Sequence, residues 1–217
     1  MIGYMESLEK SERNIKIEVE GEFDNYIPKD FIDDPVGYFE RFGENIKKGN
    51  RKIDDKGVIR DDPTAVKDLP VWRNQEGLEK HVVGKLVNID KGNIRKTGDP
   101  FYEYKVLQRL NQLRLPSAKI VARVEQDGMY LILMERIPGL RWHELKSLNL
   151  GDVGYSEEDI NILKCSAEKQ MGELRERFEE LGIVRNWELK DMVIEIDIPN
   201  KKIISIIPTD WERTKII

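Results

Sequence analysis

The chain has 217 residues, of which 35% are charged and 39% hydrophobic, and its formal net charge is −5. This length accommodates one large domain or a two-lobed one. The acidic balance and the lack of a clustered basic stripe exclude a typical nucleic-acid-binding surface, and no apolar run approaches the ~20 residues that cross a bilayer. We therefore expect no nucleic acid partner and no membrane insertion.

Cys165 is the single cysteine, so it can form neither an intrachain disulfide nor a cysteine metal cluster. The first residues, Met1–Glu6, lack the positive region and the apolar core of a signal peptide. Together these features predict a cytoplasmic protein. Abundant lysine, glutamate and isoleucine give a thermophile-like composition, in which surface ion-pair networks are stabilising.

The N-terminal 62 residues are acidic, with sixteen acidic and eleven basic side chains, whereas the remainder of the chain is neutral. Alternation in Ile15–Glu20 predicts a half-buried strand, and Asp34–Phe42 predicts a short helix with proline in its first turn. The charge-rich run 50–63 predicts a loop. We interpret residues 1–62 as a partly ordered extension, which either supplies the first strands of a sheet or docks a partner.

The segment 63–139 has the pattern of a sheet lobe with one helix and a hinge. His81–Val87 is rich in β-branched residues and predicts a strand. Asp99 and Pro100 predict the N-cap and the first position of the helix. Two further strands are predicted at Ile120–Glu125 and Met129–Met134. An Asp-Gly turn lies between them, which favours a hairpin.

The segment 140–217 predicts a small helical lobe with a terminal hairpin. Residues 142–148 form a short amphipathic piece. Ser156 and the acidic residues after it resemble a capping box, and apolar residues at three- and four-residue steps then predict a long helix that stops near Gly182. Two apolar strands follow, Met192–Ile198 and Ile203–Ile207. The order of elements predicts an α+β protein in which a sheet lobe is joined to a helical lobe.

Two separate motifs carry a resemblance to a known family. The first is the apolar run Leu131–Met134, which breaks at Glu135 and ends in Pro138-Gly139, and the second is Ile207–Arg213, an apolar strand followed by Asp-Trp-Glu. Together they resemble the hinge and the metal-binding aspartate of the protein-kinase-like superfamily, especially its small atypical and aminoglycoside-phosphotransferase-like branch. The resemblance implies a minimal two-lobed protein-kinase-like fold, truncated after the strand that carries the aspartate.

The resemblance also implies the roles of individual residues. Lys85 would contact nucleotide phosphates and pair with Glu103, eighteen residues later. The alternative is that Lys85 is an exposed strand lysine and that Glu103 is favoured only by the helix dipole. The adenine of ATP would bind against Met134 and the backbone of Glu135 and Ile137. In the second motif, Asp210 would bind Mg²⁺, so ATP and Mg²⁺ are the expected cofactors.

The segment that matches the catalytic loop departs from the family. Active relatives read approximately Gly-Ile-Val-His-(Arg or Gly)-Asp-Leu-Lys-Pro-x-Asn-Ile-Leu, and here the segment begins at Gly182. Aligned from that glycine without gaps, a tryptophan and a methionine replace the aspartate and the asparagine. One inserted residue places Glu188 at the aspartate. Asp191 lies close enough to substitute if the loop is rearranged, so Glu188 and Asp191 are the candidate catalytic residues.

Three parts of the kinase machinery are altered. The catalytic aspartate and the asparagine are replaced, and the chain lacks a Gly-x-Gly-x-x-Gly loop before Lys85. The expected function is therefore nucleotide binding with impaired or absent phosphotransfer, as in a pseudokinase. One alternative is an active, atypical Mg-ATP-dependent phosphotransferase that acts on a protein or a small molecule. The other is a partner-binding scaffold that binds no nucleotide. The sequence stops seven residues after Asp210, so a protein partner is expected to complete the short C-terminal lobe.

Overall fold

The computed structural model describes residues 14–45, 66–90, 92–141, 155–211 and 213–217. They form two compact units. The first contains the described residues up to Gln108 together with Lys119–Arg136, and the second contains Arg109–Ala118 and Ile137–Ile217. The elements predicted at 50–63 and 142–148 lie outside the described residues. No helix in the described ranges is long and apolar enough to cross a membrane.

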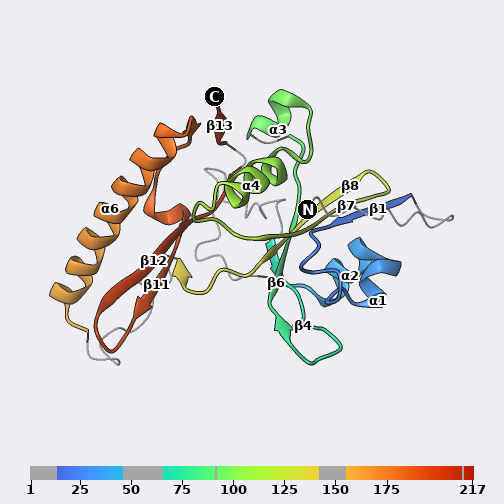
Figure 1. Cartoon of the computed structure of the whole chain (residues 1–217), viewed down its shortest axis with the longest axis horizontal. Coiled ribbons are helices and arrows are strands. Elements are labelled where there is room, and N and C mark those ends of the chain that lie inside the picture. The colour runs from blue at the N-terminus through green and yellow to red at the C-terminus, as the bar shows by residue number, and fades with distance from the viewer. Residues whose placement is uncertain (1–13, 46–65, 91, 142–154, 212) are drawn as a thin grey trace, which may run out of the picture. The chain divides into compact units, whose positions relative to one another are not determined.

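The first unit is built on a six-stranded antiparallel sheet with the order β1-β7-β8-β6-β3-β2 (Figure 1). Its strands are β1 (Ile15–Val19), β2 (Glu44–Asn45), β3 (Val66–Asp68), β6 (Val82–Leu86), β7 (Ile120–Gln126) and β8 (Met129–Glu135). A separate hairpin consists of β4 (Trp72–Arg73) and β5 (Glu79–Lys80). The predicted strand in the acidic N-terminal segment is confirmed, because β1 pairs with β7 along its whole length.

The hairpin of β7 and β8 confirms the predicted Asp-Gly turn. Asp127 and Gly128 have φ values of +50° and +78°, the left-handed region at both central positions of a two-residue turn. Aspartate and glycine are among the residues that adopt this conformation most readily, and it matches the twist of the flanking strands. The turn therefore sets the pairing register of Gln126 with Met129.

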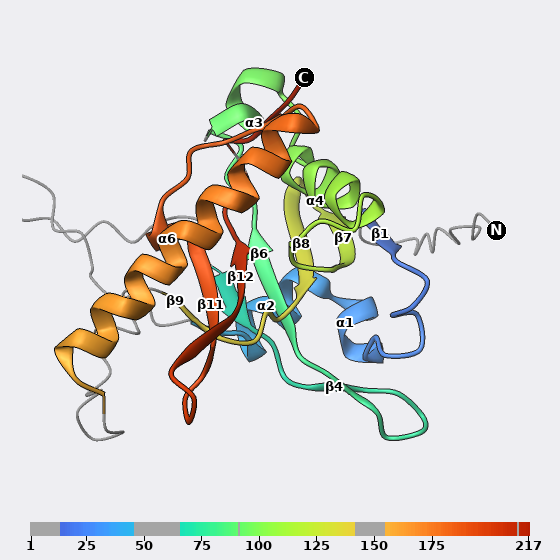
Figure 2. The same cartoon turned by 60° about the vertical axis from the view of Figure 1, so that its left-hand side comes forward.

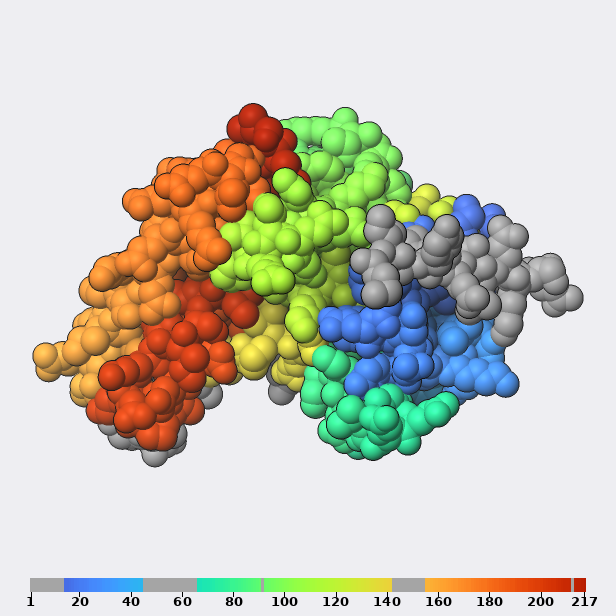
Figure 3. Space-filling model, in the orientation of Figure 1, coloured from blue at the N-terminus to red at the C-terminus, as the bar shows by residue number. Residues whose placement is uncertain are grey.

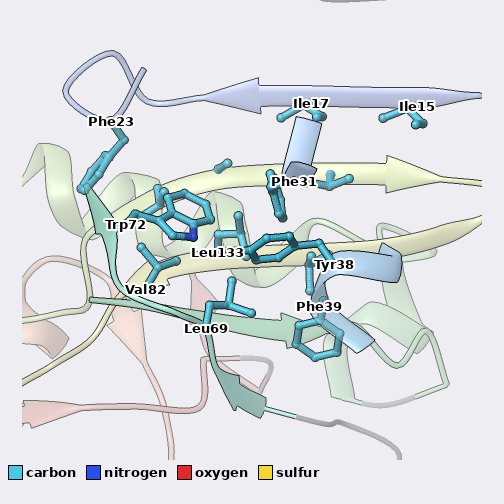
Figure 4. Packing of buried hydrophobic residues seen from close by; sticks show 14 residues of the cluster. Ile15, Ile17, Phe23, Phe31, Tyr38, Phe39, Leu69, Trp72, Val82 and Leu133 are labelled. Carbon is cyan, nitrogen blue, oxygen red and sulfur yellow. The ribbon is translucent and has the colours of Figure 1, made fainter. Parts of the chain in front are cut away.

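One face of this sheet is covered by two short helices, α1 (Lys29–Asp33) and α2 (Pro35–Phe42). Figure 4 shows Phe31 and Phe39 of these helices pointing toward the strands, in a cluster that also holds Trp72, Val82 and Leu133. The alternation along β6 directs Val82 toward this cluster and Lys85 to the opposite face. The N-terminal helices therefore cover the face of the sheet that does not carry Lys85.

Helix α4 (Tyr102–Gln112) starts two residues later than predicted. The carboxylate of Asp99 accepts a hydrogen bond from the backbone N–H of Phe101 at 3.0 Å, so residues 99–101 form an Asx turn instead of the first helical turn. A short helix, α3 (Gly92–Thr97), precedes it and was not predicted. Six residues are too few to show a helical period, so this helix left no pattern in the sequence.

The second unit packs a long helix, α6 (Glu157–Glu180), on a three-stranded antiparallel sheet of order β12-β11-β9. Figures 2 and 3 show α6 along the hairpin of β11 and β12. The strands are β9 (Leu140–Arg141), β11 (Met192–Asp197) and β12 (Lys202–Pro208), and a separate pair joins β10 (Ile183–Val184) to β13 (Lys215–Ile216). The predicted capping box is confirmed, with the side chain of Ser156 bonded to the N–H of Asp159. The predicted terminal hairpin is confirmed as well.

Two glycine substitutions should change stability in opposite directions. A Cβ at Gly84 would lie 2.7 Å from Phe39 Cδ2 and 3.3 Å from Leu133 Cδ2, so Gly84→Ala should lower the free energy of unfolding by about 1–3 kcal/mol. Gly172 lies inside α6, where an added Cβ meets nothing within 4 Å, so Gly172→Ala should raise it by about 0.5–1 kcal/mol. Urea denaturation measures both. A neutral Gly84→Ala would contradict the described packing.

Candidate functional site

The candidate residues fall into two groups, one in each unit. In the first unit, Lys85 lies on β6 and Glu103 in the first turn of α4. Lys85 Nζ is 2.6 Å from Glu103 Oε2, and only 9% and 3% of the two side chains are exposed. The alternative of an exposed strand lysine is therefore wrong. The position of Glu103 near the helix N-terminus adds a favourable interaction with the helix dipole.

This ion pair is costly to form because two charges leave water, and each is tolerated only in the presence of the other. A lysine held in this way presents a fixed positive charge, and an ammonium group carries three N–H donors. Such a group is suited to phosphate oxygens. That Lys85 contacts a nucleotide stays a prediction.

The predicted hinge residues lie at the end of β8 and just beyond it. Met134 is half-buried opposite Val83 of β6. The backbone N–H of Glu135 donates to the carbonyl of Lys119 at 2.8 Å, and its carboxylate is 2.8 Å from Lys80 Nζ. The N–H of Glu135 is therefore bonded within the sheet, so adenine would have to hydrogen-bond to the carbonyl of this residue. Ile137 belongs to the second unit.

In the second unit, Asp191 and Asp210 lie close enough for their charges to interact. Asp191 ends a single 3-10 turn, η2 (Leu189–Asp191), directly before β11, and Asp210 follows the end of β12. Burial raises the pKa of Asp191, and the nearby charge of Asp210 raises this pKa further. Two carboxylates at adjacent strand ends are a donor set suited to Mg²⁺, which typically binds one or two carboxylates together with phosphate oxygens and water.

The backbone around Asp210 is held in a conformation that non-glycine residues seldom adopt. Asp210 has a φ of +63°. Both the backbone N–H and the hydroxyl of Thr209 donate to the backbone carbonyl of Asp191, at 2.8 and 2.9 Å. These bonds connect Thr209, the residue before Asp210, to the backbone of Asp191. Local backbone strain of this kind occurs preferentially at functional sites.

Sequence reasoning missed Arg185, which organises this region. Its guanidinium donates to the backbone carbonyls of Asn186 and Thr209, at 3.1 and 2.8 Å. The same group lies 5.3 Å from the ring centroid of Trp187 and 4.5 Å from that of Trp211. Cation–π contacts of a buried arginine are stabilising, so Arg185 ties the loop after β10 to the segment before Asp210. The signal in the sequence was an arginine two residues before a tryptophan.

Glu188 has local partners in the loop. Its carboxylate accepts hydrogen bonds from the side chains of Asn186 and Lys190. The bond from Lys190 is the main reason that the pKa of Glu188 is below its usual value. A carboxylate with a lowered pKa is a weaker base, which argues against Glu188 as the proton acceptor.

Among the described residues, no three or more acidic, histidine or cysteine side chains form a group that could hold a metal ion.

Comparison of the chain with models of protein families and with curated proteins finds no match.

Removing one member of the buried ion pair should be far more costly than replacing both. We expect Lys85→Met and Glu103→Leu each to lower the free energy of unfolding by about 3–5 kcal/mol, because a buried charge is left without its partner. The double variant should be close to the wild type. Urea denaturation of the four proteins gives the coupling energy. Single variants that cost less than about 1 kcal/mol would show that the pair is not buried in solution.

The raised pKa of Asp191 predicts the direction of a pH effect on stability. A carboxyl whose folded pKa lies above its unfolded value favours folding while it is protonated, and this contribution is lost as pH rises from the unfolded pKa through the folded one. In metal-free buffer, Asp191→Asn should therefore be more stable than the wild type at pH 7, and the gain should vanish at about pH 3. Urea denaturation followed by tryptophan fluorescence measures this.

Glu188→Gln is the matched control for this pH experiment. The pKa of Glu188 is lowered, so its carboxylate favours folding at neutral pH and this variant should show no gain. An Asp191→Asn protein no more stable than the wild type at pH 7 would contradict the environment described for Asp191.

Proposed function

We propose that the chain is a protein-kinase-like domain that binds ATP with Mg²⁺ and has impaired or absent phosphotransfer. The buried pair of Lys85 and Glu103 carries this proposal. In protein kinases the lysine lies on the third strand of the sheet and its glutamate on helix αC. Here β6 is the third of the neighbouring strands β2, β3 and β6, and α4 supplies the glutamate.

The metal-binding half of the proposal depends on Asp210 and Asp191. In the kinase pattern an asparagine binds magnesium directly before an apolar strand, and an aspartate after a later strand binds it as well. In this chain Asp191 directly precedes β11, and Asp210 follows β12. The carboxylates of both residues fit the oxygen ligands that Mg²⁺ prefers, and the metal would carry phosphate oxygens of the nucleotide.

The position of β11 supports a new register for the catalytic loop. Counting from the strand rather than from Gly182 places Asp191 at the asparagine of the kinase pattern and Asn186, five residues earlier, at its aspartate. An amide cannot accept the hydroxyl proton of a substrate as a carboxylate does. Phosphotransfer should therefore be weak or absent, while both metal ligands are kept.

An active phosphotransferase is the second candidate, and one observation favours it. Phosphoryl transfer depends largely on positioning and electrostatic stabilisation, and a base contributes only part of the acceleration. Asp191 has a raised pKa and lies beside Asp210, so it has the properties of a general base if it is not occupied by metal. Formation of ADP that is lost in Asp210→Asn would support this candidate.

The two-lobed arrangement, a protein partner and the cytoplasmic location are part of the same proposal. They follow from the resemblance and from the composition of the chain. The remaining alternative is a scaffold that binds a partner without nucleotide, and nucleotide binding distinguishes it from the other two.

Thermal unfolding with an ATP analogue tests the proposal. A ligand at ~100 times its Kd stabilises the native state by roughly 2.7 kcal/mol, a readily measured shift in Tm. We expect a shift with the analogue and magnesium that is reduced in Lys85→Met and loses its magnesium dependence in Asp210→Asn. Lys169→Met, on an exposed position of α6, is the matched control and should keep the full shift.

Two outcomes of this experiment would change the proposal. A shift that is the same with and without magnesium would remove Asp210 and Asp191 from the site. No shift at millimolar analogue would leave the partner-binding scaffold as the function.

A further inference from the structure

Four residues that face one another across neighbouring strands form a row on the sheet of the first unit. Glu18 of β1 pairs with Arg123 of β7, Arg123 with Ile132 of β8, and Ile132 with Lys85 of β6. Residues directly opposite in adjacent strands point to the same face. Glu18, from the acidic N-terminal segment, is therefore on the same face and in the same row as the lysine of the candidate site.

Helix α4 lies over this row. At one end, Glu103 pairs with Lys85. At the other, the Arg123 guanidinium carbon is 5.3 Å from the ring centroid of Tyr104 and 5.0 Å from that of Phe101, while Glu18 accepts two hydrogen bonds from the same guanidinium. A bidentate carboxylate fixes the plane of the arginine, so Glu18 orients the surface on which α4 rests.

Glu20 adds a direct bond to the helix. Its backbone N–H donates to the carbonyl of Val121 at 2.9 Å, which fixes the residue at the end of β1. The hydroxyl of Tyr104 donates to Glu20 Oε1 at 2.8 Å, and Tyr104 is 4% exposed. Burial and the neighbouring carboxylate raise the pKa of Tyr104, so the hydroxyl keeps its proton and remains a donor at neutral pH.

The same segment reaches the end of β8. Glu22 is 3.6 Å from Lys119 Nζ, which is 3.9 Å from Glu135. Lys80 Nζ lies over the ring of the buried Phe23 at 5.1 Å and is bonded to Glu135 as well. Residues 18–23 therefore contact α4 beside the ion pair and also the two lysines that bind Glu135 at the end of β8.

We infer that the N-terminal strand β1 and the turn after it position helix α4, and that Glu20 and Glu18 act through Tyr104 and Arg123 to keep Glu103 on Lys85. Glu20, Glu18, Arg123 and Tyr104 are positioning residues. The acidic N-terminal segment therefore fixes the position of α4 at the candidate site through contacts within the chain. The value of this arrangement for ATP binding rests on the proposed function, whereas the mechanical coupling does not.

The reactivity of Lys85 reports on the coupling without any nucleotide. Its amine should be protected from an amine-reactive reagent while it is buried against Glu103, and labelling of the peptide that contains Lys85 can be measured by mass spectrometry. Glu103→Gln gives the signal for a broken pair. We expect Glu20→Ala and Tyr104→Phe to raise the labelling rate of Lys85 about tenfold, because a hydrogen bond to a charged group no longer holds the helix.

Two controls make the result specific. Glu20→Gln keeps an oxygen that accepts from Tyr104 and should restore most of the protection. Lys16→Ala removes a cross-strand ion pair of the same two strands, 3.7 Å from Glu125, and should leave labelling unchanged. Circular dichroism verifies folding, and if Glu20→Ala fails to fold, Tyr104→Phe carries the test because its ring still packs on Arg123.

The outcomes separate this inference from the proposed function. Lys85 labelling at the wild-type rate in Glu20→Ala and Tyr104→Phe, with a rise in Glu103→Gln, would overturn the inference. A rise in all three supports it, whether or not the wild type binds the ATP analogue. If the ATP analogue causes no Tm shift in the wild type, this result would count against the proposed function alone.

Discussion

The buried ion pair of Lys85 and Glu103 is the interaction on which the first unit depends. The attraction inside the protein must offset the several kcal/mol that each charge loses on leaving water, so the geometry of both side chains has to be fixed. Alternation along β6 provides this for Lys85, because its neighbours Val82 and Leu86 pack into the aromatic cluster on the opposite face. On the other side, the short helix α4 holds Glu103 at its first turn.

The acidic N-terminal segment lies outside the part of the chain that resembles a kinase, yet it contacts both faces of the sheet. Its helices α1 and α2 bury Phe31 and Phe39 against one face. Its strand β1 supplies the carboxylates that bind Arg123 and Tyr104 on the other. The segment is therefore a structural part of the first unit, and its charge serves local pairing inside that unit.

Strong local signals in the sequence predicted the elements that depend on local chemistry. The Asp127-Gly128 turn, the Ser156 capping box and the terminal hairpin all followed from residue types at fixed spacing. Helix α3 was too short to show a period, and the Asx turn at Asp99 delayed the start of α4.

The candidate site could be predicted only in part. Lys85 and Glu103 were identified from their order along the chain. The loop near Asp191 was aligned from Gly182, although the sequence also predicted the strand that begins at Met192, and the proposed register counts from that strand. The contact between Glu20 and Tyr104 joins residues 84 positions apart, and no local pattern in the sequence encodes it.

Isothermal titration of ATP with magnesium into the wild type and into the double variant Lys85→Met/Glu103→Leu tests the central claim most directly. The double variant replaces the buried pair by apolar groups and should remain folded, so lost binding would report on the site rather than on stability. We predict saturable, magnesium-dependent binding to the wild type and none to the double variant. Equal binding to both proteins, or no binding to a folded wild type at millimolar ATP, would contradict the account.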